Sequence, residues 1–328
     1  MRSASIYAAS MVLLATACDQ PPCGGRLSDA CRKAQDMAHV MGLQIADDYN
    51  DGSPILGDVA TMGATGKGAI SVRLTGMRRH DIRIGGQTIR ADSGGIGPSA
   101  FSTASKTATA VSVDGAFGAW GGRPVGRTRM GGVDVLGSVI VVPNANHGDL
   151  NVGGKPILLG GGVRIGFMEE TRSLPAMSLT GMIRLGFEFS GSVPSLPTDN
   201  GQSVKISFES GSFGTLEYRL AASKKAGNFG VSGGIGHNVY FITTAYDLDG
   251  GALGTGFEST SFNVTRTAAF VGATYTRKKL TLGAELGRVM GGDLPALVNT
   301  FGDRGPTPAR NYLSVGVRVP AGRTVDRR

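Results

Sequence analysis

The sequence predicts an all-β protein, an antiparallel transmembrane β-barrel of about ten strands with a short N-terminal periplasmic helix. Three observations predict this fold: long segments of alternating polarity, connections that alternate in length, and a mean hydropathy near zero, +0.01. The clearest segment is 176–190, whose odd positions are apolar and whose even positions are mostly polar. A β-strand points successive side chains to opposite faces, so this segment has one apolar face and one largely polar face. It is longer than the about 9–11 residues that a tilted strand needs to cross a bilayer.

The composition excludes several other classes of protein. The 328 residues include 53 glycines without a collagen period, and only 18% are charged, which argues against charge-driven disorder. The net charge of +8 is compatible with an anionic partner, either nucleic acid or an anionic membrane surface, and also with Lys and Arg scattered over a solvated surface. Because the basic residues form no stripe, we expect no nucleic acid; outer-membrane lipid and lipopolysaccharide are the expected partners.

The first 17 residues have the pattern of a secretory signal peptide, 1–17. Arg2 precedes an apolar run from Ile6 to Leu14, and Ala15-Thr16-Ala17 has the form of a cleavage site. Beyond it the chain has no run of about 18 apolar residues, so we expect no transmembrane helix.

Three cysteines follow the signal. Leu14-Ala15-Thr16-Ala17-Cys18 resembles a bacterial lipoprotein box, although Ala15 stands where that pattern prefers leucine. Cys18 is therefore a candidate for lipidation. Cys23 and Cys31 are candidates for a disulfide in the oxidising periplasm, and two free thiols in a flexible leader are the alternative.

Residues 18–65 are predicted to be a periplasmic leader with a helix at about 28–49. Ser28 is a plausible N-cap. Apolar residues recur every three or four positions and give the helix one apolar face: Ala30, Ala34, Met37, Met41 and Ile45. The helix is interpreted either as a plug or periplasmic lid, or as an element packed beneath the barrel without gating it.

Ten segments with alternating polarity make up the predicted barrel, 66–319, which a basic tail, 320–328, follows. They are 66–78, 106–119, 131–142, 156–168, 176–190, 202–223, 228–246, 257–276, 279–291 and 311–319. An even number of strands is typical of bacterial single-chain barrels and places both ends of the barrel on the periplasmic side.

The connections between these segments alternate in length. Long ones occupy 79–105, 143–155, 191–201, 247–256 and 292–310, and mostly shorter ones occupy 120–130, 169–175, 224–227 and 277–278. Long outer loops and short periplasmic turns are typical of outer-membrane barrels. The long segment 79–105 contains Ile82, Ile84 and Ile89 and leaves open a further hairpin, which would make twelve strands.

Three stretches resemble strands of uncharacterised outer-membrane β-barrel proteins of Gram-negative bacteria: Asp134-Val-Leu-Gly-Ser138, Leu220-Ala-Ala-Ser-Lys224 and Tyr312-Leu-Ser-Val-Gly-Val-Arg318. The resemblance supports the fold and a place in the cell outer membrane, and it implies no site. We also expect a monomer that the outer-membrane assembly machinery inserts, although Val319-Pro320 stands where many barrels end on an aromatic residue.

Charged residues on the polar parity are predicted to face the lumen. These are Arg73, Asp114, Asp134, Arg164, Arg184, Glu188, Lys205, Glu209, Glu217, Arg219, Glu285 and Arg318. Their signs nearly balance, which favours a filled, ion-paired interior over a path for small solutes.

Catalytic and metal-binding patterns are weak, and we expect neither an enzyme nor a cofactor. His80 and His147 stand beside Asp81 and Asp149 in predicted outer loops, which invites comparison with omptin proteases, but no omptin motif matches. His237 lies on the apolar parity of its strand, which suggests a local bulge. The chain shows no metal-ligand spacing of Cys and His.

The sequence therefore predicts a small passive pore or uptake channel for small or hydrophobic solutes. The alternative is a closed structural or surface-interaction barrel whose outer loops bind ligand or lipopolysaccharide. A barrel-embedded hydrolase is a remote third hypothesis.

Overall fold

The structure is a computed structural model of the whole chain. It describes residues 25–48, 52–63, 65–83, 87–91, 101–142, 151–154, 157–292, 294 and 307–321, without the side chains of 103, 151–154, 187–189, 194, 209 and 210. The predicted signal peptide, Cys18, Cys23 and the tail from 322 onward lie outside the described residues.

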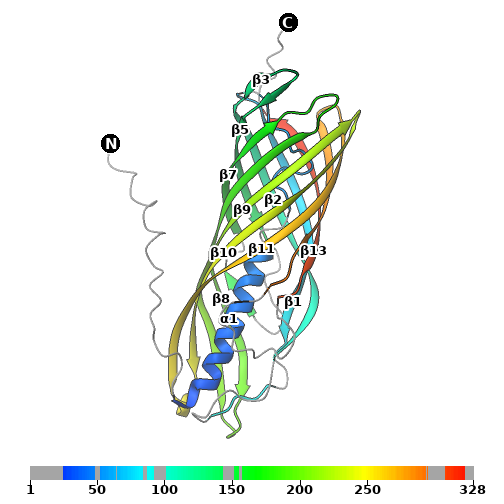
Figure 1. Cartoon of the computed structure of the whole chain (residues 1–328). Helices are drawn as coiled ribbons and strands as arrows, with labels where there is room; N and C mark the ends of the chain where they lie inside the picture. The colour runs from blue at the N-terminus through cyan, green and yellow to red at the C-terminus, as the bar shows by residue number, and fades with distance from the viewer. Residues whose placement is uncertain are drawn as a thin grey trace, which may run out of the picture.

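Within the described residues, ten antiparallel strands form a closed barrel (Figure 1). They are β1 (Gly68–Arg83), β2 (Ser102–Trp120), β5 (Gly132–Val141), β7 (Ile157–Met168), β8 (Ala176–Pro197), β9 (Ser203–Ala226), β10 (Phe229–Asp249), β11 (Thr255–Arg277), β12 (Leu280–Val289) and β13 (Arg310–Ala321). Each barrel strand pairs with the next barrel strand along the chain, and β13 pairs with β1, so the cylinder is closed at the level where all ten strands run side by side. Nearer the outer end, residues 255–266 of β11 pair with β10 alone among the described strands. Closure satisfies every strand edge in lipid.

Three short strands lie outside this cylinder. β3 (Arg123–Val125) and β4 (Thr128–Met130) form a hairpin between β2 and β5, and β6 (Asn151–Gly154) pairs with β8. The predicted number of ten barrel strands is confirmed. The segment 79–105 gives β1 and β2 longer outer ends, and its residue Ile89 makes an isolated bridge to Thr198.

The two ends of the barrel differ in the length of their connections. At one end the β9–β10 and β11–β12 turns span only 227–228 and 278–279, and β1 begins and β13 ends there. At the other end the β1–β2 and β12–β13 connections span 84–101 and 290–309. Short turns face the periplasm in outer-membrane barrels, so we name these the inner end and the outer end.

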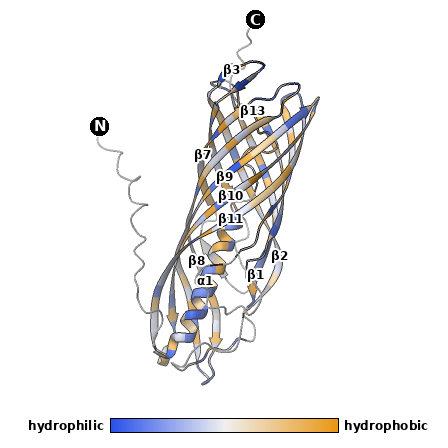
Figure 2. Cartoon of the chain, in the orientation of Figure 1, coloured by the Kyte–Doolittle hydropathy of each residue, from blue (hydrophilic) through white to orange (hydrophobic). Residues whose placement is uncertain are grey.

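An apolar belt surrounds the part of the barrel next to the inner end. Outward-facing side chains here include Val231, 62% exposed, Leu286, 55% exposed, and Leu313, 52% exposed. Figure 2 shows hydrophobic residues distributed along the strands of this region. Lipid solvates such a belt in a membrane, whereas water would not.

The strands β8 to β11 extend far beyond this belt toward the outer end. Their lengths are 22 residues for β8, 24 for β9, 21 for β10 and 23 for β11. Most of the predicted loop 191–201 and half of the predicted loop 247–256 are therefore strand. The outer ends of these strands face water on one side and bury apolar residues on the other.

These inward residues pack on the N-terminal helix α1 (Ser28–Asp48), which follows the short 3-10 helix η1 (Gly25–Leu27). α1 contacts β1, β2, β9, β10 and β11, and nearly all of it is buried. Figure 1 shows α1 inside the cylinder, near its outer end. The helix therefore lies inside the barrel, as the plug interpretation predicts, and the predicted periplasmic position beneath the barrel is wrong. The same alternation of polar and apolar residues suits a helix in either place, because each position offers one apolar contact surface and polar surroundings. No described helix has the length and hydropathy to cross a bilayer.

Candidate functional site: the filled interior of the barrel

The outer half of the bore holds α1. The predicted apolar face is buried, but so are most polar residues on the other side of the helix. Lys33 pairs with Asp29 at 2.9 Å, and its ammonium also donates to the carbonyl of Thr88 at 2.9 Å. Buried charges need such partners, because an isolated ion in a protein interior is costly. The helix therefore fits an enclosed bore rather than a free surface.

His39 lies in the middle of α1, beyond the apolar belt. Its Nε2 is 2.9 Å from the Thr260 hydroxyl on β11, and its ring contacts Phe262 with the centroids 4.3 Å apart. Burial lowers the pKa of His39 to about 4, and the nearby Asp36 carboxylate opposes this shift only in part. The imidazole is therefore neutral at pH 7.

Two aspartates at the carboxyl end of α1 tie it to the wall. Arg310 on β13 lies 3.2 Å from the Asp47 carboxylate, and Arg79 on β1 lies 3.2 Å from the Asp48 carboxylate. Arg310 also donates to the main-chain carbonyl of Asp47 at 2.8 Å. Acids are unfavourable at the negative end of a helix dipole, so the two arginines offset a local electrostatic cost.

The inner half of the bore holds the segment 52–63, which connects α1 to β1. Ser53 lies between charges from three strands: Arg73 donates to its carbonyl at 2.9 Å, Arg219 donates to its hydroxyl at 3.1 Å, and Glu285 accepts from its N–H at 3.0 Å. The Ser53 hydroxyl also donates to Glu285. The segment is thus bonded to the wall on several sides.

Asp58, further along the same segment, meets basic residues near the inner end. Arg318 lies 2.9 Å and Lys225 lies 3.3 Å from its carboxylate, and Arg164 donates to its carbonyl at 2.8 Å. Met62 then donates its N–H to Asp134 at 3.0 Å. The chain is therefore held along the bore from the carboxyl end of α1 to the inner end.

The wall carries its own ion-pair network at this level. Arg184 pairs with Glu217, Glu217 pairs with Arg219, and Arg219 lies 3.3 Å from Glu285. The hydroxyl of Tyr312 donates to Glu285 at 2.9 Å. All of these charged side chains are almost completely buried. Such a network fills space and leaves few groups to line an open path.

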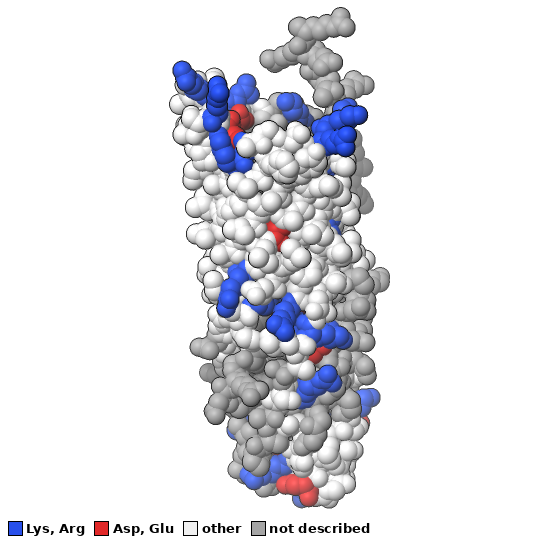
Figure 3. All heavy atoms as spheres, turned by 90° about the vertical axis from the view of Figure 1, so that its right-hand side faces the viewer, with Lys and Arg blue, Asp and Glu red and all other residues white. Residues whose placement is uncertain are grey.

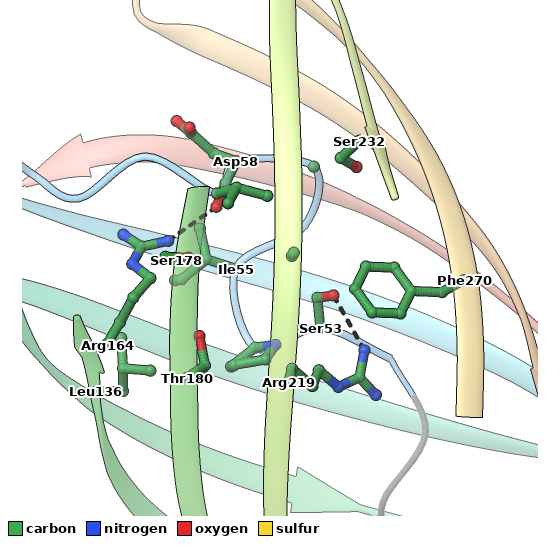
Figure 4. Close-up of a pocket in the computed structure, with 14 residues that line it drawn as sticks. Ser53, Ile55, Asp58, Leu136, Arg164, Ser178, Thr180, Arg219, Ser232 and Phe270 are labelled. Carbon is green, nitrogen blue, oxygen red and sulfur yellow. Dashed lines mark hydrogen bonds between the residues drawn. The ribbon is translucent and has the colours of Figure 1, made fainter. Parts of the chain in front are cut away.

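Two smaller groups complete the charged interior. Arg164 lies 2.7 Å from Asp134, and Arg73 lies 3.6 Å from Asp114, which also accepts from Ser138 at 2.6 Å. A cavity of about 30 Å³ remains beside the segment 52–63 (Figure 4). Figure 4 shows Arg164 directed to Asp58 and Arg219 directed to Ser53 across it. This volume accommodates a water molecule rather than a solute.

Nine of the twelve predicted lumen residues face the interior: Arg73, Asp114, Asp134, Arg164, Arg184, Glu217, Arg219, Glu285 and Arg318. Lys205 on β9 faces outward and is exposed, so its predicted lumen position is wrong. Glu188 and Glu209 lie on β8 and β9, and their side chains are outside the described set.

A β-bulge explains the outward position of Lys205. On β9, Ser212 stands opposite Thr243 and Glu209 opposite Ala245, so Ser210 and Gly211 together face one residue of β10. The inserted residue exchanges the two faces of the strand. Val204 therefore faces inward and packs in the core around α1, while Leu220 on the other side of the bulge faces outward.

Sequence reasoning missed the residues that tie the segments inside the bore to the wall. The sequence pattern predicts a periplasmic leader that includes Asp47, Asp48, Ser53 and Asp58, and it assigns no role to Arg79 and Arg310. Arg79 shares the parity of Arg73 on β1, which signals an inward position. Two adjacent acids at a helix end were a further signal for basic partners.

Three further predictions concern a disulfide, a bulge at His237 and metal-binding residues, and the structure describes only a part of the residues involved. Cys31 is disulfide-bonded, and the Cys23–Cys31 pairing stays a prediction because Cys23 lies outside the described residues. His237 is exposed on β10, whose register with both neighbours is continuous at this position, so the suggested bulge is wrong there. Among the described residues, no group of three or more His, Cys, Asp or Glu side chains could hold a metal ion.

The candidate hydrolase residues do not converge where they are described. Asp81 is buried and lies 2.6 Å from Arg79, whereas His80 precedes it on β1 and is directed to the other face of the sheet. His147 and Asp149 lie outside the described residues. Among the described residues, no histidine of this set forms a hydrogen bond or an ion pair with a carboxylate.

No protein-family model and no curated protein sequence matches the chain. Solved structures similar to it include the translocator domain of autotransporter NalP from Neisseria meningitidis, at 14% identity and a TM-score of 0.38, covering 88% of this chain and 96% of that one. The outer membrane protease OmpT from Escherichia coli has 11% identity, a TM-score of 0.40, and coverage of 78% and 97%. The P. putida toluene transporter TodX has 9% identity, a TM-score of 0.30, and coverage of 84% and 95%.

These likenesses give no information on activity. The architecture itself is informative, since a closed antiparallel barrel with a lipid-compatible belt and a polar interior is the form in which bacterial strands cross the outer membrane. The chain is an outer-membrane β-barrel protein.

Proposed function

We propose that this protein is a closed barrel that acts through its outer end, as a structural or surface-interaction protein, rather than as a passive pore. The observation that carries the proposal is that α1 and the segment 52–63 occupy the bore from its outer half to its inner end. An open channel needs a continuous aqueous path, and balanced buried ion pairs oppose one.

The strength of the attachment supports a stable closed state. Contacts from the inner segments to the wall include the Asp47–Arg310, Asp48–Arg79 and Asp58–Arg318 ion pairs. Breaking a buried pair by removing one partner costs about 3–5 kcal/mol, because the other charge stays uncompensated. Spontaneous departure of the whole segment would break several such pairs at once.

Single-channel recording in planar bilayers tests the proposal. We expect the wild-type protein to show no steady open state at moderate voltage. The double variant D47N/D48N, which weakens the ties at the carboxyl end of α1, should show brief openings more often. A stable, ohmic conductance of the wild-type protein would overturn the closed barrel and restore the passive pore.

The second candidate is an uptake channel that opens when its interior segment moves. It is favoured by one observation: ion pairs and side-chain hydrogen bonds connect α1 to the wall, and such contacts can be exchanged for water without breaking the barrel ladder. Uptake of a small solute into vesicles, present in the wild type and lost when α1 is covalently locked, would support this candidate over the closed barrel.

The hydrolase hypothesis gains nothing from His80 and Asp81, which point to opposite faces of β1. We therefore assign no catalytic role to any described residue.

A further inference from the structure

Two arginines face the membrane side of the barrel on strands that are two apart. Arg78 on β1 and Arg288 on β12 are exposed, and β13 lies between them. Arg288 stands opposite Asn311 of β13, and Met77, next to Arg78, stands opposite Tyr312, next to Asn311. Adjacent strands are about 4.8 Å apart, so the two arginines start about 10 Å apart on either side of Asn311.

These arginines mark the outer border of the apolar belt. The outward residues of β1 between its inner end and Arg78 are Ile70, Val72, Leu74 and Gly76. The stretch from Gly68 to Arg78 spans ten residue steps. At about 3.3 Å per residue and a tilt of about 40° they rise about 25 Å, the height of the apolar band of outer-membrane barrels. Arg78 therefore lies at the headgroup level of the outer leaflet.

The charge of this face is one-sided. At the outward-facing positions of β1, β2, β12 and β13 that the structure describes, the sequence has no aspartate or glutamate. Neither Arg78 nor Arg288 forms an ion pair with a described residue. Figure 3 shows Lys and Arg gathered in a band across this side of the molecule, with an acidic side chain beside them, below a broad belt with little charge.

We propose that Arg78, Asn311 and Arg288 form a binding site for a bisphosphorylated glycolipid of the outer leaflet, the lipid A part of lipopolysaccharide. Guanidinium groups bind phosphate through charge-assisted, often bidentate hydrogen bonds. Two arginines on strands two apart suit phosphates at the two ends of a disaccharide, and the Asn311 amide between them suits the sugar hydroxyls.

Apolar side chains directly beneath the arginines suit the acyl chains of the same lipid. Leu74 is 48% exposed on β1, Leu286 is 55% exposed on β12, and Leu313 is 52% exposed on β13, each within four residues of the polar group above it. The site is on the outer wall and is independent of whether the bore is open, so it goes beyond the proposed function.

Binding of purified lipid A to the full-length protein in detergent tests the site. We expect R78Q/R288Q to bind bisphosphorylated lipid A about 30-fold more weakly than wild type, since each basic residue contributes about a factor of five at an anionic lipid surface. The matched control is K278Q/K279Q, which removes two exposed charges from the β11–β12 turn at the inner end and should bind as wild type does.

A second arm removes the phosphates instead of the arginines. Monophosphorylated lipid A should bind the wild type about five-fold more weakly than bisphosphorylated lipid A does. In the single variant whose missing arginine would contact the absent phosphate, R78Q or R288Q, the two lipids should differ much less in affinity. Heat-modifiable gel mobility verifies that each variant forms the barrel.

Three results would overturn the site. Binding of R78Q/R288Q equal to wild type would exclude the arginines, and an equal loss in K278Q/K279Q would reveal non-specific charge attraction. Competition by phosphatidylglycerol as strong as that by lipid A would indicate a general anionic-lipid surface instead.

Discussion

Glu217 is a central residue of the ion-pair network inside the barrel. Its carboxylate pairs with Arg184 from β8 and with Arg219 from its own strand, and Arg219 continues the network to Glu285 on β12. Arg219 also lies over the Phe270 ring, 5.0 Å from its centroid. In a water-poor interior each charge is stabilised by its oppositely charged neighbour. Substitution of one residue of this network therefore leaves a buried charge uncompensated and lowers the stability of the protein strongly.

The first prediction compares two charged residues of the same strand, β9. Glu217→Gln leaves Arg184 and Arg219 undercompensated and should lower the free energy of unfolding by about 3–5 kcal/mol. Lys205→Gln, at the exposed outward position, should change it by less than about 0.5 kcal/mol. Urea unfolding of the protein in lipid vesicles measures both. Similar effects of the two changes would contradict the opposite orientations of these side chains.

The second prediction concerns the pH dependence of α1. Burial lowers the pKa of His39 to about 4 from its ordinary value of 6.5. A lowered histidine pKa contributes stability that is complete above pH 6.5 and decreases as the pH falls toward 4. The contacts of α1 should therefore loosen over this range.

NMR titration of labelled histidine follows the His39 ring directly, with an expected midpoint near 4. A midpoint near 6.5 would mean that the ring is hydrated and that α1 is not enclosed. The variant His39→Gln provides the assignment of the signal and should show weaker dependence of α1 protease resistance on pH in this range.

Most of the inward charges were predictable from the sequence, because a strict two-residue period fixes the face of each strand once one face is known. Lys205 was not, because a bulge adds a residue and exchanges the faces beyond it. Nothing in the stretch Glu209-Ser210-Gly211-Ser212 distinguishes a bulge from a regular strand except its small residues. Likewise, Arg78 and Arg288 are 210 positions apart in the chain and become neighbours only through the β1–β13 and β12–β13 pairings.

At the scale of elements, the helix was predictable and its position was not. The apolar spacing from Ala30 to Ile45 indicates a helix in either place. Ser28, the predicted N-cap, is the first residue of the helix, and its hydroxyl makes no hydrogen bond to a described residue, so the predicted capping role is wrong. Polar residues on one face of such a helix suit both the water of the periplasm and the polar interior of the barrel, so they do not distinguish the two positions. The discriminating feature is close contact: a Cβ on Gly42 would lie 2.6 Å from Cγ2 of Ile242 on β10, so α1 fits against the wall only with glycine there.

The third prediction uses this contact to lock α1 in place. The Cβ position of Gly42 lies 3.8 Å from Cβ of Ile242, within the about 3.5–4.5 Å that a disulfide requires. The double variant G42C/I242C should therefore form a disulfide, because the second change also removes the methyl group that would clash. Peptide mapping under non-reducing conditions detects it.

The control for this cross-link is G42A, which should destabilise the protein in the presence of Ile242 and do so less in an I242A background. Absence of the Gly42–Ile242 cross-link under oxidising conditions in a folded barrel would show that α1 is elsewhere. In the locked variant, the brief openings expected for D47N/D48N should disappear and return on reduction.

At the scale of the whole molecule, strand number and closure follow from repeated segments and from the alternation of their connections. Ten predicted segments correspond to ten barrel strands. The extension of β8 to β11 beyond the belt was missed because apolar inward residues there, such as Ile206 and Ile242, have the same alternating pattern as lipid-facing ones. Alternation reveals that a strand has two faces, and not which of them faces lipid.

The fourth prediction concerns the direction of the chain through the barrel. η1 and the amino end of α1 lie at the outer end, where Leu27 approaches Gly250 in the β10–β11 turn. An epitope inserted at Gly25, which is exposed and has open space around it, should therefore bind antibody on intact cells. The same epitope at Gly227, in the β9–β10 turn of the inner end, should bind only after the outer membrane is permeabilised.

An insertion at Gly251, in the outer β10–β11 turn, is the positive control. If the Gly25 epitope were reached only in permeabilised cells while the Gly251 epitope was reached in intact ones, the helix would have to enter the bore from the periplasm.

The position of α1 also constrains the order of events in biogenesis. α1 and 52–63 precede β1 in the chain, and β1 must pair with β13, the last of the described strands, before the cylinder is complete. After β1 and β13 have paired, the helix would have to pass through the bore, which the buried ion pairs of the wall occupy. We therefore expect α1 and the segment 52–63 to be in place before β1 and β13 pair, so that the wall and the segments inside it fold together.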